Sequence, residues 1–102
     1  MSLNKKKSDK VSQSTDLADV FKAFSDPTRL RILIELAKAD ACVHELCNTL
    51  SMSQTAVSHH LRQLRGQHLV STRRAGRETY YAIAADFVPG VIEEVRRHVE
   101  AV

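Results

Sequence analysis

Apolar residues recur every three or four positions along most of this chain, which is the spacing of one face of an amphipathic helix. With the cap and stop residues around them, they predict helices over 15–25, 27–38, 43–50, 54–65 and 86–102. Two runs rich in Val, Thr and Tyr predict strands over 69–74 and 78–83, joined by a turn at Ala75-Gly76-Arg77. The predicted fold is therefore mainly α with a small β-hairpin.

The ends of these elements carry their own chemistry. Asp26 and Pro27 mark the start of the second helix, and Thr15 or Asp16 can cap the first. Residues 1–14 are polar, hold four lysines and show no hydrophobic period. We therefore expect a flexible basic arm over 1–14 and one domain over 15–102.

Length and composition restrict the function classes. With 102 residues, 43% of them hydrophobic, the chain has room for one modest core. No apolar run is long enough to span a bilayer and no apolar signal core follows the basic N-terminus, so we expect a cytoplasmic protein without a membrane partner. A metal-dependent hydrolase is disfavoured because no general base stands beside an open metal position, and we expect no enzyme.

Two short predicted helices joined by the polar turn Ser51-Met52-Ser53 form a helix-turn-helix. In the second of them Val57, Leu61 and Leu64 share one face. The opposite face carries hydrogen-bonding side chains that can reach base edges or phosphates, namely Gln54, Thr55, Ser58, His59 and Arg62. By itself, this face could also be an ordinary solvated surface.

The hairpin turn adds a second feature, because Arg73, Arg74 and Arg77 surround Gly76 and suit a phosphate backbone or a minor groove. A helix-turn-helix followed by a basic hairpin is a winged helix, and the two features together predict DNA binding. We expect His60 to face DNA or its flank and His68 to lie in the helix-to-wing turn. A winged helix that binds only proteins stays a remote alternative.

Three segments resemble the ArsR/SmtB family of metal-responsive repressors: LADVFKAFSDPTRLRILIEL, SMSQTAVSHHLRQLRGQHLV and RRAGRETYYAI. The resemblance covers about residues 16 to 100. It implies a winged helix-turn-helix homodimer, paired through its first and last helices, that represses transcription from a palindromic operator. The apolar positions of 17–24 and 88–99 agree with such an interface.

Cys42, His44 and Cys47 lie within the six-residue run Cys-Val-His-Glu-Leu-Cys and offer three soft or borderline metal ligands. In an arbitrary sequence, Cys47 would simply pack as a small core residue. The family resemblance implies a sensor site at these positions, with His44 in place of a middle cysteine. Two thiolates and an imidazole favour Zn²⁺ or Cd²⁺ as the metal inducer, and As³⁺ or Sb³⁺ stays an alternative.

Two other interpretations of how the protein responds to an inducer stay open. Cys42 and Cys47 could instead form a thiol redox or persulfide switch, since a helix N-terminus lowers the pKa of a thiol. The family's second sensor site lies in the last helix, where Asp86 and His98 resemble parts of it. Val88 stands where a histidine is expected, so this second site looks degraded.

Overall fold

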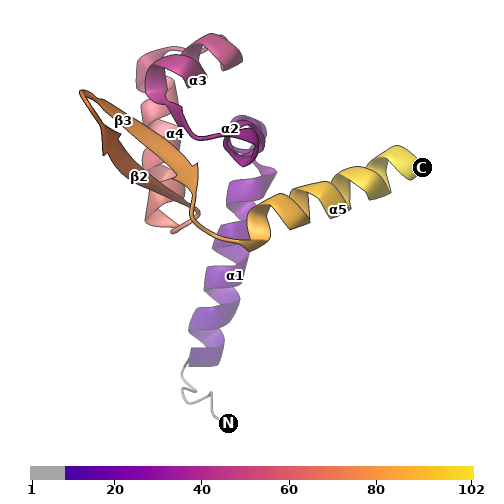
Figure 1. The fold of residues 1–102 in the computed structure, drawn as a ribbon. Helices are drawn as coiled ribbons and strands as arrows, with labels where there is room; N and C mark the ends of the chain where they lie inside the picture. The colour runs from indigo at the N-terminus through magenta and orange to yellow at the C-terminus, as the bar shows by residue number, and fades with distance from the viewer. Residues whose placement is uncertain (1–8) are drawn as a thin grey trace.

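A computed structural model describes the backbone of residues 9–102 and the side chains of residues 17–102. Figure 1 shows a body of short helices with a small sheet at one edge, from which the first and last helices project. The elements in chain order are α1 (Asp9–Ser25), α2 (Pro27–Lys38), β1 (Ala41–Cys42), α3 (Val43–Leu50), α4 (Gln54–Gly66), β2 (Val70–Ala75), β3 (Glu78–Ile83) and α5 (Phe87–Ala101). The predicted mainly helical fold with a helix-turn-helix and a hairpin is confirmed.

Local chemistry sets the starts of α2 and α4. The Asp26 carboxylate accepts a hydrogen bond from the backbone N–H of Arg29 at 2.9 Å, and Pro27 occupies the first turn, where its missing N–H is not needed. Ser53 caps α4 in the same way, with its hydroxyl oxygen 3.1 Å from the N–H of Ala56. Both helices begin at the predicted residues.

The first helix is longer than predicted. It begins at Asp9, upstream of the expected cap at Thr15 or Asp16, so residues 9–14, which we assigned to the arm, are helical. Our prediction followed the apolar period, which is missing from this polar stretch. The stretch contains no Gly or Pro, however, so nothing stops the helix from continuing upstream. The remainder of the predicted arm, residues 1–8, lies outside the described residues.

The sheet has three strands in the order β1-β3-β2, whereas the sequence predicted only two. β2 and β3 form the predicted hairpin, and β1 lies on the other edge of β3, pairing Ala41 with Tyr81 and Cys42 with Tyr80. A strand of two residues is too short to show an alternating pattern. At the hairpin turn Gly76 adopts a φ of 64°, a left-handed conformation that glycine takes without strain.

The core lies between α2, α3, α4 and the sheet. Its largest fully buried side chains are aliphatic: Ile32, Leu33, Leu46, Val57, Leu61, Leu64, Leu69 and Val88. Three of them form the predicted inner face of α4. Val88 comes from the first turn of α5 and fixes the base of that helix to the body.

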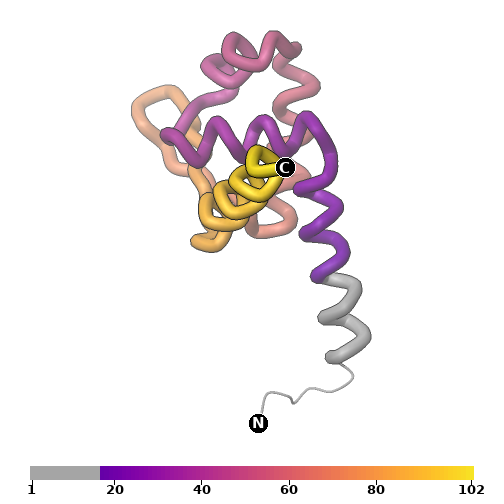
Figure 2. Tube along the Cα trace, turned by 90° about the vertical axis from the view of Figure 1, so that its right-hand side faces the viewer, coloured from indigo at the N-terminus to yellow at the C-terminus, as the bar shows by residue number. Residues whose placement is uncertain are grey.

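The projecting helices keep apolar surface uncovered. At the base of the projection the rings of Phe24 and Phe87 stack with their centroids 6.3 Å apart. Farther out, Phe21 on α1 is 65% exposed and Val99 on α5 is 63% exposed. Figure 1 shows α5 extending away from the body while α1 runs in another direction, and in Figure 2 α5 is seen nearly end-on. Within the described part of the chain, no helix has the length and apolarity needed to cross a membrane.

Candidate DNA-binding surface

The outward side of α4 is polar because burial of Val57, Leu61 and Leu64 fixes the inward side. On the outward side four of the predicted DNA-binding residues are exposed and one is half-buried: Gln54, Thr55, His59 and Arg62, with Ser58 half-buried. The structure therefore brings these five side chains together on one helix. Their donors and acceptors are of the kinds that contact base edges and phosphates in a major groove.

Tight turns hold α4 between its neighbours. Ser51 adopts a left-handed conformation after α3, with φ 57° and ψ 49°, and the N–H of Met52 donates to the carbonyl of Cys47 at 3.1 Å. At the other end of α4, His68 takes a φ of 61° and turns the chain into β2. This confirms the predicted place of His68 in the helix-to-wing turn.

A polar cluster between α2 and α4 was missed by the sequence analysis. The Arg29 Nη1 donates to Gln63 Oε1 at 2.7 Å, which joins the two helices. The backbone N–H of Arg29 holds the pKa of the Asp26 carboxyl below its usual value; burial opposes this lowering, and the positive charge of Arg29 adds to it. His60, which we expected to face DNA or its flank, is half-buried, with its Nδ1 shielded from solvent.

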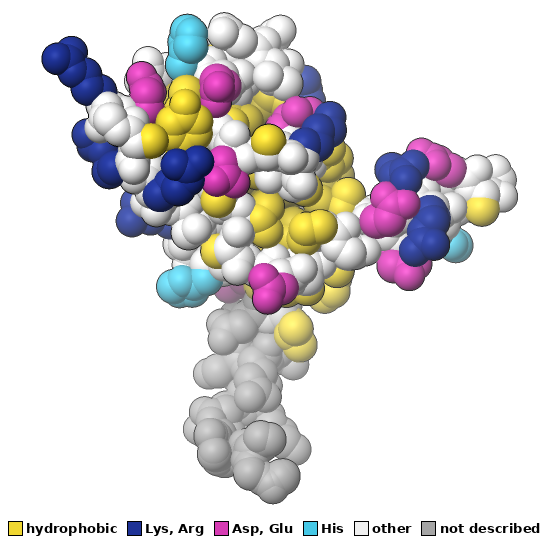
Figure 3. Space-filling view, in the orientation of Figure 1, with side chains coloured by type: hydrophobic (Ala, Val, Ile, Leu, Met, Phe, Trp, Pro, Cys, Tyr) yellow, Lys and Arg dark blue, Asp and Glu magenta, His cyan; other side chains and the backbone are white. Residues whose placement is uncertain are grey.

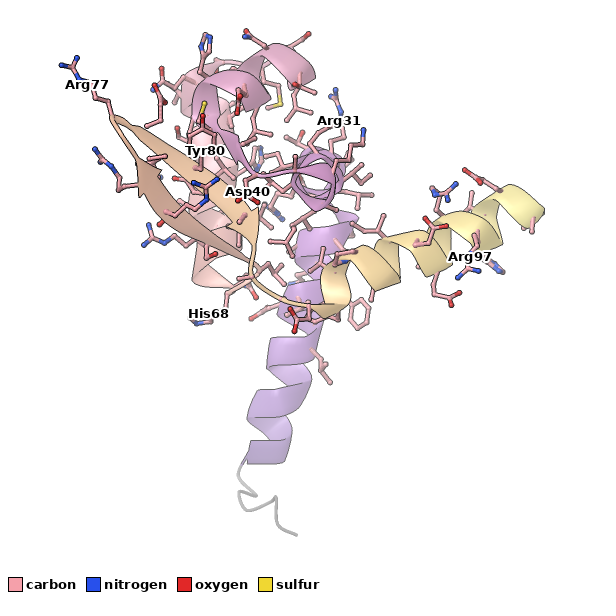
Figure 4. The ribbon with its side chains drawn as sticks, viewed as in Figure 1. Arg31, Asp40, His68, Arg77, Tyr80 and Arg97 are labelled. Carbon is pink, nitrogen blue, oxygen red and sulfur yellow. The ribbon has the colours of Figure 1, made fainter. Side chains whose placement is uncertain are left out.

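We define the wing as β2, β3 and the turn between them, and its three arginines occupy two settings. Arg74 and Arg77 are exposed and pair with no carboxylate among the side chains of residues 17–102. Arg73 instead places its Nε 3.1 Å from Asp40 Oδ2 and its guanidinium carbon 5.0 Å from the centroid of the Tyr80 ring. Basic side chains gather at the wing in Figure 3, and in Figure 4 Arg77 points away from its tip. The three arginines are therefore not one free cationic cluster.

The three candidate metal ligands lie at the start of α3 in different environments. Cys42 is buried and precedes the helix, where its backbone N–H donates to the Glu45 carboxylate at 3.0 Å. Cys47 is half-buried, and both cysteines are free thiols. His44 is exposed, with its Nε2 3.5 Å from the side-chain nitrogen of Asn48. The thiol of Cys42 thus packs inward while the imidazole of His44 meets solvent.

In this structure the three side chains do not converge on one point. Among the side chains of residues 17–102, no group of three or more Cys, His, Asp or Glu is placed to hold an ion. The donor types suit a thiophilic metal, but the structure does not bring them together. On α5, Asp86 precedes the helix and His98 lies in its last turn, about 18 Å apart for a straight helix, and Val88 is a core residue. These residues therefore form no second site.

Sequence reasoning also missed Asp40 and Tyr80, the partners of Arg73. The alternation of side chains along a strand gave a usable signal, because Arg73 and Arg74 must point to opposite faces of β2. The alternation could not identify Asp40, because this residue lies 33 positions away in the chain and comes close to Arg73 only when β1 joins the sheet.

The fold and this surface define a winged helix-turn-helix DNA-binding regulator of transcription. The model of the arsR family of bacterial regulatory proteins matches residues 26–72. Over 90 residues the chain is 41% identical to a transcriptional repressor SmtB homolog from Synechocystis, covering 88% of this chain and 68% of that one. It is 34% identical to the cadmium resistance transcriptional regulatory protein CadC homolog of Staphylococcus aureus, covering 94% and 81% of the two chains.

The fold has close counterparts among solved structures. The homodimeric winged helix-turn-helix DNA-binding domain from Mycobacterium bovis superposes with a TM-score of 0.83 at 29% identity, over 98% of this chain and 91% of that one. With these similarities the assignment is direct: the chain belongs to the ArsR family of bacterial regulatory proteins.

Proposed function

We propose that this protein is a homodimeric repressor that binds a palindromic operator with α4 in the major groove and the wing on the adjacent backbone. The observation that carries this proposal is the exposed polar face of α4 next to a wing on which Arg74 and Arg77 have no acidic partner within residues 17–102. Arg62 adds a third cation on α4 itself. Such side chains serve both phosphate positioning and base reading.

The dimer follows from the uncovered apolar positions of α1 and α5. Leu17 and Phe21 on α1 are 60% and 65% exposed, and Val95 and Val99 on α5 are 56% and 63% exposed. Large apolar side chains exposed on two projecting helices are unfavourable in a monomer and typical of a subunit interface. The Mycobacterium bovis domain is homodimeric, which supports a homodimer for this chain as well.

DNA binding is tested with fluorescence anisotropy on a labelled duplex covering the region upstream of the gene for this chain. We expect wild-type protein to bind with an affinity that falls steeply as salt rises, and Arg62→Ala and Arg77→Ala to bind more weakly. Arg31→Ala is a matched control, because Arg31 is equally exposed but lies on α2 (Figure 4). DNA binding that is equally tight in all four proteins would refute this surface as the DNA contact, and a wild-type protein that binds no duplex would favour a winged helix that contacts only protein.

A metal response at Cys42, His44 and Cys47 is the finer part of the proposal. Its support is the donor set and the name of the Staphylococcus aureus relative, a cadmium resistance regulator. We expect Zn²⁺ or Cd²⁺ to weaken operator binding by about 5- to 150-fold, the ordinary range of allosteric coupling. As³⁺ and Sb³⁺ are the alternative ions.

The same anisotropy assay tests the inducer when Zn²⁺, Cd²⁺ and arsenite are added in turn to the reduced protein. His44→Ala should lose most of a metal response, whereas a dithiol switch at Cys42 and Cys47 should survive that change. Cys47→Ser would abolish both responses and so does not separate them. DNA affinity that none of the ions changes, but an oxidant or persulfide donor does, would refute the metal response in favour of the thiol switch.

A further inference from the structure

Arg73 is held from two sides by its own chain. Its Nε lies 3.1 Å from the Asp40 carboxylate, and its guanidinium group lies over the ring of Tyr80 at 5.0 Å. Both contacts engage the cation, one by charge and one by the negative face of the ring. In Figure 4 Asp40 and Tyr80 lie next to each other at the side of the sheet, whereas Arg77 stands apart at the wing tip.

The sheet register explains how these residues meet. Arg73 on β2 is paired with Tyr80 on β3, and Tyr80 is paired with Cys42 on β1. Because β3 is the middle strand, Arg73 crosses it over the Tyr80 ring to reach Asp40, in the short link between α2 and β1. We call Asp40, Arg73 and Tyr80 the wing clamp. It ties the outer strand of the wing to the end of α2.

We infer that Arg73 and Asp40 are positioning residues that set the angle of the wing, while Arg74 and Arg77 carry the charge to the phosphates. This inference rests on the proposed function, since it concerns how the same surface is presented to DNA. A short ribbon with few core contacts moves unless something holds it, and holding it in the bound position removes an entropy cost of binding. The clamp does this from outside the DNA contact.

The clamp predicts a change in DNA affinity opposite to the change that charge alone would cause. Removing a carboxylate near a DNA-binding surface ordinarily strengthens binding, because the repulsion of phosphates is reduced. Asp40→Asn should instead weaken it, because the wing is released. The pair is partly exposed, at 40% for Asp40 and 55% for Arg73, so we expect a loss of about two- to fivefold in affinity.

Four variants provide the comparison, measured by anisotropy on the labelled upstream duplex over a range of salt concentrations. Glu78→Gln is the matched control for Asp40→Asn, because it removes an exposed carboxylate at the start of β3 without touching the clamp. Arg73→Ala should weaken binding as Asp40→Asn does and leave the salt dependence unchanged. Arg77→Ala should lower the salt slope by about one per subunit, as loss of a phosphate contact does.

Either of two results would overturn the inference. One is that Asp40→Asn binds as tightly as Glu78→Gln or more tightly; the other is that Arg73→Ala lowers the salt slope as Arg77→Ala does. If wild-type protein fails to bind any duplex, the proposed function fails, and the clamp is then judged in the free protein. There, Asp40→Asn and Arg73→Ala should speed hydrogen exchange of the β2 amides and Glu78→Gln should not; equal protection in all three would refute the clamp.

Discussion

Asp26 caps the N-terminus of α2, and the loss of unfolding free energy on its removal can be estimated. Its carboxylate accepts the N–H of Arg29 at 2.9 Å and satisfies one of the free donors of the first turn. Asp26→Ala loses this hydrogen bond and the negative charge at the helix N-terminus, while the backbone bond from the Leu30 N–H to the Asp26 carbonyl stays. We expect a loss of about 1 kcal/mol, within a range of roughly 0.5–2 kcal/mol.

The matched variant is Asp26→Asn, which caps a helix about as well but carries no charge. It should lose only the helix-dipole contribution, about 0.3–1 kcal/mol. Thermal unfolding at fixed protomer concentration should order the proteins as wild type, Asn and Ala, with about 4–8 °C per kcal/mol for a chain of this size. The fixed concentration matters because dimerisation also raises the melting temperature.

The pH dependence provides a separate check. The hydrogen bond from Arg29 holds the folded-state pKa of Asp26 below its ordinary 3.8, so the charged form is favoured by folding. Its contribution is therefore complete above the unfolded-state pKa and disappears as pH falls through the lower folded-state pKa. The advantage of wild type over Asp26→Asn should vanish in this acid range. Equal losses for Asn and Ala at neutral pH would show that the cap hydrogen bond contributes nothing.

Three further predictions concern the core, the wing turn and the subunit interface. Leu61→Ala should lose about 2–5 kcal/mol of unfolding free energy by denaturant titration because Leu61 is fully buried, whereas its neighbour Arg62→Ala should change it by less than about 0.5 kcal/mol. Gly76→Ala should lose about 1 kcal/mol of unfolding free energy because alanine is strained at a φ of 64°, and Gly76→Asn should lose less because asparagine tolerates this conformation. A Cβ at this position meets no atom within 4 Å, so no clash adds to either loss. Phe21→Glu should raise the dissociation constant of the dimer at least about a hundredfold, because covering the 65% exposed ring contributes roughly 3 kcal/mol per subunit. Lys22→Glu is the control and should leave the dissociation constant unchanged; light scattering measures both. An unchanged dimer in Phe21→Glu would place the interface elsewhere.

The sequence predicts an element well where one residue type controls one local event. Asp26 and Pro27 begin a helix, and Gly76 turns a hairpin, and both features occur as predicted. The start of α1 was wrong because no such residue marks it; the helix simply continues through polar positions to Asp9. β1 was missed because its two residues are a strand only through pairing with β3, far along the chain.

In the candidate site, too, features set by local sequence were predictable and features set by distant contacts were not. The face of α4 follows from helical periodicity alone, so the predicted polar side chains of that helix share one surface. The arginines of the wing look equivalent in sequence, but a contact with Asp40 across the sheet separates Arg73 from Arg74 and Arg77. We expected Cys42 and His44 to converge on one ion, but sequence spacing does not fix the directions of side chains. In the structure Cys42 is buried and His44 is exposed.

The two elements proposed to face DNA, α4 and the wing, are both attached to α2. Near its first turn, Arg29 bonds Gln63 of α4, and just beyond its last turn, Asp40 holds Arg73 of the wing. α2, which has 12 residues and is about 18 Å long, lies between these attachments and fixes the spacing between α4 and the wing. α2 also packs against α1 and α5, the helices proposed to form the dimer. A change in dimer geometry that moves α2 should therefore move α4 and the wing together, and we expect operator affinity to follow the position of this one helix.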